Sequence, residues 1–312
     1  MADFFNEKRI LVTGGSGFVG SRLVTALHNR GAHLKMLVRT INHDLCFDQV
    51  QCDLSQCDIP IDCLTGVSII FHLAGFTHDF RDPKKVEKEY RRVNVDASIQ
   101  LAKLAARGGV KRFVFVSSVK AGGTDLSEVY ESDNVPCVPE GVYGQTKREA
   151  ELAILKIGSE TGMHVSIIRP SLVYGLGVKG NLRLMISGIE KGWFPPLPDV
   201  SNRRSMIHVD DLVYALFLVA ENNKANGEVF IATDGQVYSA RELYETICIV
   251  MGKPIPQWSI PKCIFDFISL INPGIRYKID KLLGDEWYSS GKLESLGFTP
   301  QRIFKDFKRS SF

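Results

Sequence analysis

Tyr143 and Lys147 stand four residues apart in the sequence YGQTK. In a helix this spacing places both side chains on one face, one turn apart. An ammonium beside a phenol favours the phenolate, so the pKa of the tyrosine can fall from about 10 towards neutrality when a further positive charge is near. Such a tyrosine is a usable general acid or base. A surface tyrosine beside a solvated lysine has the same spacing, so the pair alone is a weak indication.

Ser118 ends the apolar run FVFVSS, which has the composition of a buried strand. From the end of a strand its hydroxyl can reach the same point as the Tyr143 side chain and form a hydrogen bond to a reacting oxygen. Serine, tyrosine and lysine in this order are together suited to proton transfer at a hydroxyl or carbonyl group.

A glycine-rich segment, TGGSGFVG, directly follows the first predicted strand, and its glycines have the spacing G-x-x-G-x-x-G. Gly14 would allow a tight turn, Gly17 a close approach of the main chain to a pyrophosphate, and Gly20 the packing of helix on strand. Phe18 and Val19 would lie in the first helical turn, where backbone N–H groups bind phosphate. An ordinary glycine-rich turn is the alternative, but a strand before it and a helix after it favour a dinucleotide site.

Arg39 stands at the end of the second predicted strand, where an NAD site usually has an acidic residue for the ribose 2′-hydroxyl. A guanidinium cannot accept a hydrogen bond from that hydroxyl but binds a 2′-phosphate well, so Arg39 favours NADP over NAD. A solvated surface arginine is the alternative. Asp53, at the end of the third strand with Leu54 beside it, is placed to accept a hydrogen bond from the adenine amino group. Ala74 and Gly75 follow the fourth strand and leave room for the cofactor.

Short β-branched runs predict six strands, and helical patterns alternate with them. The predicted strands are Arg9–Thr13, His33–Val38, Val50–Asp53, Val67–Leu73, Arg112–Ser117 and Val165–Arg169. The predicted helices are Gly17–Arg30, Pro83–Arg107, Tyr143–Thr161, Asn181–Lys191, Leu212–Glu221 and one that a capping box of Ser239 and Glu242 opens and that ends at Val250. Strands that alternate with helices through right-handed crossovers give an α/β fold with a doubly wound, parallel, Rossmann-type sheet.

After Pro170 the sequence becomes rich in glycine and proline, as in KGWFPPLPDV. This change predicts a smaller and looser C-terminal lobe that binds the substrate. We expect residues 1–174, with 205–234 returning to them, to form the dinucleotide-binding domain. Residues 175–204 and 235–312 are expected to form the substrate lobe.

The composition is that of an ordinary globular protein of about two domains, with 312 residues, 45% hydrophobic and 23% charged. The 38 basic and 35 acidic side chains leave a net charge of +3, too small and too evenly spread for a nucleic-acid or membrane-surface partner. The apolar segment Ile260–Ile271 contains Lys262 and Asp266 and is shorter than the about 20 residues that span a bilayer. The first residues have no apolar run of signal-peptide length, so we expect a cytoplasmic protein without a membrane span.

The chain contains seven cysteines, an odd number that favours a reducing compartment. Four of them, Cys46, Cys52, Cys57 and Cys63, are separated by five, four and five residues, which does not fit a tight zinc knuckle. Buried or free thiols are the simpler interpretation, and no metal site is predicted.

Together the motifs resemble those of the extended short-chain dehydrogenase/reductase family, in its NAD-dependent epimerase/dehydratase branch. The resemblance covers nearly the whole chain. It rests on TGGSGFVG, on HLAG from His72, on RVNVD around Asn94, on FVFVSS, on YGQTK, on RPSLVYG from Arg169 and on RSMIHVDDL from Arg204. It implies hydride transfer at a secondary alcohol or ketone, with Ser118, Tyr143 and Lys147 as catalytic residues. The further cofactor contacts that it implies are Leu73, Ala74, Gly75, Asn94, Ser117, Lys147 and Pro170.

Within that branch the chain resembles bacterial nucleotide-sugar enzymes, both UDP-sugar 4-epimerases and reductases of UDP-4-keto-N-acetylhexosamines in surface-polysaccharide pathways. The family's UDP-binding Asn-Leu corresponds to Asn181-Leu182, and its diphosphate-binding arginine to Arg204. Ser118 and Tyr143 are implied to contact the sugar. Thr77 stands where UDP-glucose 4-epimerases usually have a lysine, so tight retention of NAD is not implied.

These resemblances imply NAD(P)-dependent hydride transfer at C4 of a UDP-linked hexose. Arg39 and Thr77 favour a 4-ketoreductase that consumes NADPH, and the alternative is a UDP-glucose or UDP-N-acetylglucosamine 4-epimerase with retained NAD. A hydroxysteroid or flavonol type of substrate, or a dinucleotide sensor without catalysis, stays open as a further alternative. The family commonly dimerises through helices that correspond to Pro83–Arg107 and Tyr143–Thr161, so a homodimer is expected.

Overall fold

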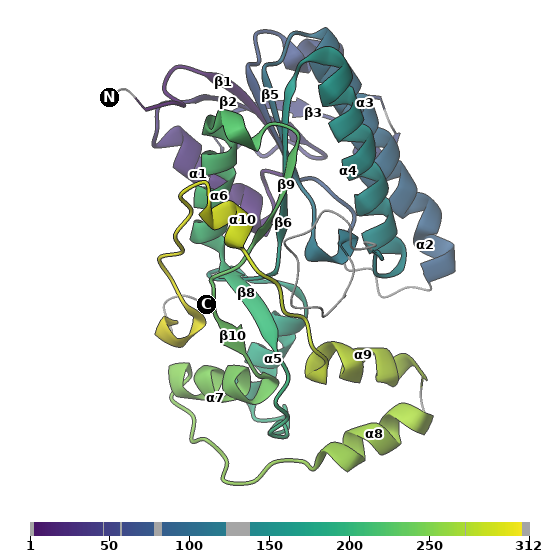
Figure 1. Ribbon diagram of the computed structural model, residues 1–312, viewed down its shortest axis with the longest axis vertical. Helices are drawn as coiled ribbons and strands as arrows, with labels where there is room; N and C mark the ends of the chain where they lie inside the picture. Colours follow the sequence, from purple (N-terminus) through teal and green to yellow (C-terminus); the bar gives the residue numbers. More distant parts are fainter. Residues whose placement is uncertain are drawn as a thin grey trace.

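The computed structural model describes residues 3–45, 47–56, 58–77, 83–122, 138–271 and 273–307. In these ranges a seven-stranded parallel sheet has the order β3-β2-β1-β4-β5-β6-β9 (Figure 1). Its strands are β1 (Arg9–Thr13), β2 (His33–Val38), β3 (Asp48–Gln51), β4 (Ile69–His72), β5 (Arg112–Val116), β6 (His164–Pro170) and β9 (Glu228–Ala232). Thr13 in β1 lies opposite Leu37 in β2 and His72 in β4. The strand order therefore reverses at β1 and β4, where open α/β sheets bind ligands.

The predicted α/β fold with a Rossmann-type sheet is confirmed, with changes at strand ends. β1 and β2 have the predicted bounds, whereas β3 begins and ends two residues before the predicted Val50–Asp53. The seventh strand, β9, was not predicted. It pairs with β6 at the edge of the sheet and is only partly buried, although its sequence EVFIA contains four consecutive apolar residues.

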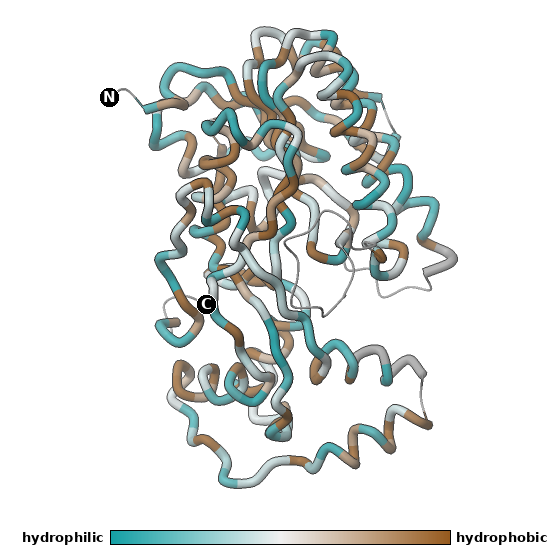
Figure 2. The backbone as a smooth tube through the Cα atoms, viewed as in Figure 1, coloured by the Kyte–Doolittle hydropathy of each residue, from teal (hydrophilic) through white to brown (hydrophobic). Residues whose placement is uncertain are grey.

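Helices cover both faces of the sheet, as Figure 1 shows. On one face lie α1 (Phe18–His28) and α6 (Val209–Glu221), and on the other lie α3 (Ala97–Arg107) and α4 (Gly141–Thr161). Strand β1 serves both layers, since Ile10 and Val12 pack on the α1 side and Leu11 packs on the α3 side. Figure 2 shows the resulting concentration of hydrophobic residues in the central strands.

The long helix predicted over residues 83–107 is interrupted. It consists of α2 (Pro83–Tyr90), a π-helical segment over Arg91–Asp96, and α3. Such wider turns are rare in proteins, and those that occur are often found at functional sites. Periodicity alone does not reveal them, because the apolar stripe continues on both sides.

The second half of the chain adds a three-stranded sheet in the order β10-β8-β7, below the central sheet in Figure 1. Its strands are β7 (Leu172–Tyr174), β8 (Arg204–His208) and β10 (Val237–Tyr238). The helices of this half, besides α6, are α5 (Gly180–Lys191), α7 (Ala240–Val250), α8 (Lys262–Ile271), α9 (Pro273–Leu283) and α10 (Gly291–Glu294). The capping box at the start of α7 is confirmed, because Ser239 Oγ accepts from Glu242 N at 3.1 Å while Glu242 Oε2 accepts from Ser239 N at 2.8 Å.

One part of the predicted substrate lobe lies elsewhere. Leu293 and Phe298, within the range 235–312, pack into the same core cluster as Leu23 of α1 and Phe217 of α6. The chain thus returns to the sheet near its end, a contact that no local pattern indicates. The remaining domain boundaries stay predictions.

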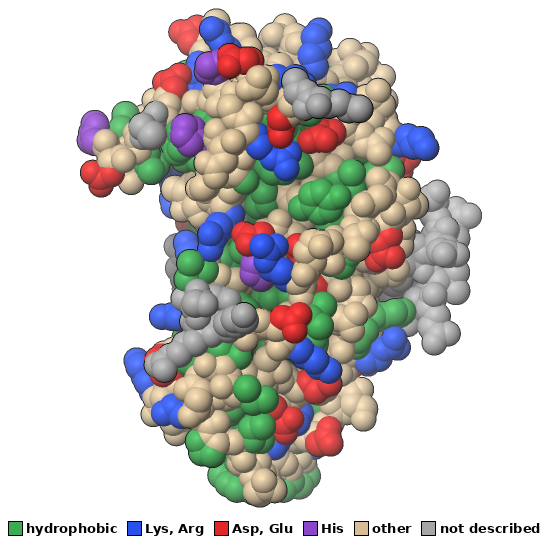
Figure 3. Space-filling model, turned by 90° about the vertical axis from the view of Figure 1, so that its left-hand side faces the viewer, with side chains coloured by type: hydrophobic (Ala, Val, Ile, Leu, Met, Phe, Trp, Pro, Cys, Tyr) green, Lys and Arg blue, Asp and Glu red, His purple; other side chains and the backbone are tan. Residues whose placement is uncertain are grey.

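Among the described helices, none is long and apolar enough to cross a membrane. On the face drawn in Figure 3, basic and acidic side chains are interleaved, in keeping with the net charge of +3. Of the clustered cysteines, Cys52 and Cys63 are buried, and burial raises the pKa of the Cys63 thiol to about 11. Cys46 and Cys57 lie outside the described residues.

Candidate active site

Most of the predicted cofactor residues lie at the carboxyl ends of the parallel strands, which meet along one edge of the sheet; Asn94 and Lys147 lie on helical segments instead. Gly14 to Gly20 follow β1, Arg39 follows β2, Asp53 and Leu54 come shortly after β3, Leu73 to Gly75 follow β4, Ser117 and Ser118 follow β5, and Pro170 ends β6. Sequence order and sheet order together therefore bring these separate motifs to one place.

The glycine-rich turn requires its glycines. Gly14 has φ +72°, and a Cβ there would lie 2.7 Å from Ala74 N. A Cβ on Gly20 would lie 2.0 Å from Gly14 O, so α1 packs directly on the turn. Gly17 caps α1 without a side chain, which leaves the N–H groups of the first helical turn, at Phe18 and Val19, directed outward. This helix end suits an anion such as a pyrophosphate.

A series of hydrogen bonds between buried side chains holds the backbone that follows β4. His72 Nδ1 lies 2.6 Å from Thr13 Oγ1, and His72 Nε2 lies 2.8 Å from Ser98 Oγ. Thr13 Oγ1 also accepts from Ala74 N at 3.1 Å. Burial, with the charge of Lys147, lowers the pKa of His72 to about 3, so the imidazole is neutral. The first residue of the HLAG motif thus holds Ala74 in position against the glycine turn.

Asn94 lies in the π-helical segment and is fully buried. Its Oδ1 accepts from Phe76 N at 2.7 Å, and its amide donates to Phe76 O and to Thr146 Oγ1, both at 3.2 Å. Both amide donors are therefore used by the protein. The structure gives this residue, predicted as a cofactor contact, the role of joining the loop after β4 to helix α4.

Helix α4 carries Tyr143 and Lys147 to the end of β5. Gly144 makes this possible, because a Cβ there would lie 2.3 Å from Lys120 O in the short 3-10 turn Val119–Ala121. The Ser118 hydroxyl lies close enough to Tyr143 to lower its pKa in part. The structure therefore brings the predicted serine and tyrosine together.

Lys147 is buried, and its Nζ donates to Val116 O at 2.7 Å. The ammonium also lies 4.1 Å from the centroid of the Phe115 ring, on the same strand. Burial lowers the pKa of Lys147 to about 7, against a partial opposing effect of Glu151. Near neutral pH this amine is therefore poised between its two protonation states.

The predicted fall in the pKa of Tyr143 depends on a further positive charge and stays a prediction; for the protein alone the shift has the opposite direction. Burial raises the pKa of Tyr143 to about 12, and the nearby Ser118 hydroxyl opposes this only in part. The ring keeps some exposure, and the electrostatic effect of Tyr90, whose ring centroid lies 6.3 Å away, raises the pKa of Tyr143 further. Spacing along a helix predicts which groups are neighbours, whereas desolvation depends on the whole fold.

Ser117 is another predicted cofactor contact. It is buried, and among the described residues its Oγ has no hydrogen-bond partner. An unsatisfied buried hydroxyl is costly and is commonly completed by a ligand or water. Together with the helix end at Gly17, this donor and acceptor fits a bound dinucleotide.

Arg39 and Asp53 are both exposed, and the Arg39 charge helps to keep the pKa of Asp53 low. The main cause of that lowering is the hydrogen bond that Asp53 Oδ1 accepts from Ser55 N at 2.9 Å. Leu54 differs from the prediction, because its side chain is buried in the core cluster of α3 and α4. Only its backbone can face a ligand.

The two adjacent residues predicted to bind the nucleotide, Asn181 and Leu182, differ in their exposure. Asn181 is exposed at the start of α5, whereas Leu182 is buried in the apolar cluster of the lower sheet. A hollow of about 620 Å³ lies beside them, lined by Leu176, Gly177, Val178, Lys179, Gly180 and Arg183. Lys179 and Arg183 in its lining suit an anionic ligand. The Leu182 side chain packs in the core instead.

Arg204 is buried and already paired. Its Nη2 donates to Glu286 Oε2 at 3.0 Å, and its Nη1 donates to Lys281 O at 2.6 Å. Glu286 in turn contacts Lys120, which also contacts Glu140. The sequence reasoning missed Lys120, Glu140 and Glu286, and only the position of Lys120 two residues after Ser118 could have indicated one of them.

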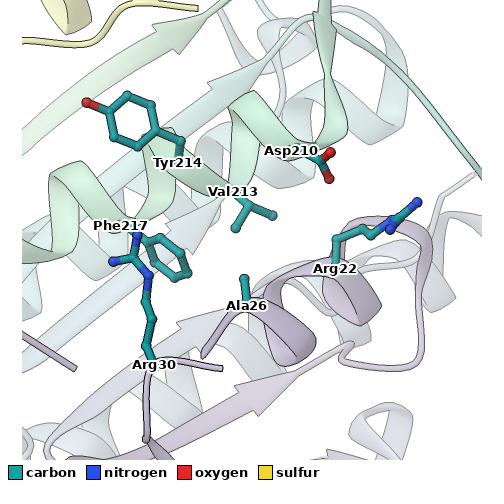
Figure 4. A pocket seen from close by; sticks show the side chains of 7 residues that line it. All are labelled: Arg22, Ala26, Arg30, Asp210, Val213, Tyr214 and Phe217. Carbon is teal, nitrogen blue, oxygen red and sulfur yellow. The ribbon is translucent and has the colours of Figure 1, made fainter. Parts of the chain in front are cut away.

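A second hollow, of about 230 Å³, lies between α1 and α6 (Figure 4). The side chains that line it are Arg22, Ala26, Arg30, Asp210, Val213, Tyr214 and Phe217. It contains none of the predicted site residues. Arg30 lies 4.2 Å from the Phe217 ring and pairs with Glu221, so this guanidinium serves the packing of the two helices.

Comparisons with known proteins give one family. Residues 10–232 match the NAD dependent epimerase/dehydratase family. The UDP-glucose 4-epimerase of Vibrio cholerae is 32% identical over 316 residues, which cover 97% of this chain and 94% of that protein. A 3-beta-hydroxysteroid dehydrogenase of Mycolicibacterium neoaurum is 29% identical over 264 residues, covering 80% and 72%.

Solved structures agree with this result. MoeE5 in complex with UDP-glucose and NAD superposes with a TM-score of 0.77 at 26% identity, covering 96% of this chain and 95% of that one. Order of motifs, sheet topology and sequence similarity over nearly the whole length lead to the same conclusion. The chain belongs to the NAD-dependent epimerase/dehydratase family, in the extended branch of the short-chain dehydrogenases/reductases, and is an NAD(P)-dependent enzyme.

Proposed function

We propose that this enzyme transfers hydride at C4 of a UDP-linked hexose, and that it works as a 4-ketoreductase that consumes NADPH. The observation that carries the proposal is the proximity of the Tyr143 and Ser118 side chains at the end of β5, with Lys147 held on Val116 one helical turn away. This is the arrangement that proton transfer at a carbonyl oxygen requires.

The cofactor would be held by the turn at Gly14, the first N–H groups of α1 at Phe18 and Val19, and the Ser117 hydroxyl. When bound, a nicotinamide dinucleotide supplies the hydride for the sugar carbon. Arg39, exposed at the end of β2, supports NADPH, because its fork of donors suits a 2′-phosphate.

The protein's own part in the reduction is to position and protonate the C4 oxygen. With a pKa raised to about 12, Tyr143 is protonated at neutral pH and can donate its proton to that oxygen. Ser118 would hold the same oxygen by a hydrogen bond. A protonated Lys147 would stabilise the phenolate that remains, and its own pKa of about 7 would then rise beside that negative charge.

A UDP-linked substrate is supported by Asn181 and Arg204, which match the family's nucleotide-binding positions, and by the UDP-glucose in MoeE5. The relative from Vibrio cholerae favours a second candidate, a UDP-glucose 4-epimerase with retained NAD. An epimerase uses its cofactor twice in each turnover and gains by keeping it, whereas a reductase must exchange it. Thr77, in place of the usual lysine, supports exchange.

Two measurements test the proposal. Tyr143→Phe should lower turnover by about 10² to 10⁴ and leave cofactor affinity unchanged. The wild-type protein should be isolated with little bound NAD and should consume one NADPH for each UDP-4-keto-hexosamine. Full activity of Tyr143→Phe would remove the catalytic assignment. Protein isolated with NAD that interconverts UDP-sugar epimers without added cofactor would establish the epimerase instead.

The homodimer remains part of the proposal. Leu152 on α4 is 53% exposed, on the helix through which the family commonly dimerises. A homodimer contact over α2, α3 and α4, the helices that the family commonly uses, would cover this side chain.

A further inference from the structure

Glu286 is held between two cations. One carboxylate oxygen accepts from Arg204 Nη2 at 3.0 Å, and the other accepts from Lys120 Nζ. The three side chains are mostly enclosed, with 10% exposure for Arg204, 16% for Lys120 and 19% for Glu286. Partly buried charges require close partners, and an anion bound through both oxygens by two cations is well stabilised.

The backbone puts this carboxylate between the two parts of the proposed substrate site. Glu286 N donates to Arg203 O at 2.7 Å, and Glu286 O accepts from Ser205 N at 2.9 Å, so Glu286 runs beside β8. Lys120 N donates to Ser118 Oγ at 3.2 Å, so Lys120 belongs to the turn that carries the proposed catalytic serine. Glu286 therefore lies between the turn with Ser118, which would act at C4 of the sugar, and Arg204, which is proposed to bind the diphosphate.

We propose that Glu286 is an internal counter-ion that holds the place of the substrate's diphosphate, and that Lys120 is a second cation for that diphosphate. This inference rests on the proposed nucleotide-sugar function. On binding, the diphosphate takes over Arg204 and Lys120, and the Glu286 side chain turns away while its backbone stays paired with β8. Glu140 keeps its own contact with Lys120.

Such an exchange selects for a doubly charged ligand. A diphosphate brings two negative charges to replace the one of Glu286, so the cations gain by the exchange. A neutral substrate, such as a steroid, offers them nothing and would leave the Glu286 pairs intact. The arrangement therefore favours substrates linked through a diphosphate over uncharged secondary alcohols.

The test is calorimetric titration of the full-length protein with UDP and with inorganic pyrophosphate. Glu286→Gln removes the competing charge at nearly constant shape and should tighten both ligands about 10-fold. Glu245→Gln is the matched control, because Glu245 pairs with Arg241 within α7. It makes the same change of charge away from the site and should leave both affinities unchanged.

Lys120 is tested with two variants of different charge. Lys120→Met should weaken both ligands about 10-fold, and Lys120→Arg should retain most of the affinity because it keeps the cation. A purely structural role for Lys120 would lower thermal stability in Lys120→Met without a selective loss of anion binding. Unchanged anion affinity in that variant would overturn its assignment.

The outcomes separate this inference from the proposed function. If the wild type binds UDP and Glu286→Gln binds it equally or more weakly, the counter-ion role is wrong and the nucleotide-sugar assignment stands. If the wild type does not bind UDP but Glu286→Gln gains affinity for pyrophosphate, the anion site stands and the nucleotide assignment fails. If no variant binds either ligand, both are wrong.

Discussion

Replacing Gly144 with alanine should move Tyr143 away from Ser118 and lower the catalytic rate, while the fold is kept. Gly144 lies in the first turn of α4, directly after Tyr143, and faces the turn Val119–Ala121. An added Cβ would lie 2.3 Å from Lys120 O and 3.0 Å from Lys120 C, where ordinary contact begins at 3.4 Å. Both neighbours are backbone atoms, so α4 or the turn must move by about 1 Å.

That movement separates Tyr143 from Ser118, because each stands on one of the two displaced segments. A misplacement of about 1 Å in an active site can cost about 10² in rate. Stability should change less. Alanine is favoured over glycine within a helix by about 1 kcal/mol, which offsets much of the about 1–3 kcal/mol that overpacking costs.

The assay is steady-state consumption of NADPH with a UDP-4-keto-hexosamine, together with thermal unfolding and cofactor titration. Gly291→Ala is the control, since Gly291 also begins a helix and its Cβ would meet only Ser289 Oγ at 3.4 Å. We expect Gly144→Ala to lose about 10² in kcat with cofactor affinity kept, and Gly291→Ala to behave as wild type. Wild-type kcat in Gly144→Ala would refute the reasoning, because the close approach would then have no bearing on the Tyr143 and Ser118 pair.

Three further outcomes are expected. Arg39→Ala should remove a preference for NADPH over NADH of roughly 10- to 100-fold, measured by fluorescence titration, and equal wild-type affinities would contradict it. Because His72 is held neutral with a pKa of about 3, the unfolded chain binds a proton below pH about 6.5 that the folded chain refuses. The free energy of unfolding in urea should therefore fall as the pH decreases, and His72 should contribute about 1.4 kcal/mol per pH unit below pH 6.5. The fall should be less steep in His72→Gln, and an equal slope in both proteins would contradict this prediction. Leu152→Glu should convert the proposed dimer to a monomer in sedimentation, whereas an unchanged mass would exclude a contact through this face of α4.

The site could be predicted from sequence where its residues follow predicted strands. Parallel strands bring their carboxyl ends to one edge, so Gly14, Arg39, Ala74 and Ser118 were expected to meet, and they do lie along that edge. The same reasoning did not extend to Lys120 or Glu286. Those charges pair across 166 residues of sequence, and no local pattern specifies such a pair.

The amino-acid sequence by itself determined the glycine turn, the alternation of strands and helices, and the helical spacing of Tyr143 and Lys147. These features follow from backbone freedom and side-chain period, which are local properties. Only the tertiary structure decided that Tyr143 is a weaker acid and Lys147 a weaker base than their model compounds, and that Leu182 belongs to the core. It also decided that the Arg204 guanidinium is already paired with the Glu286 carboxylate. The physical reason is that desolvation and charge pairing depend on which distant segments pack together, and the packing is settled by the fold as a whole.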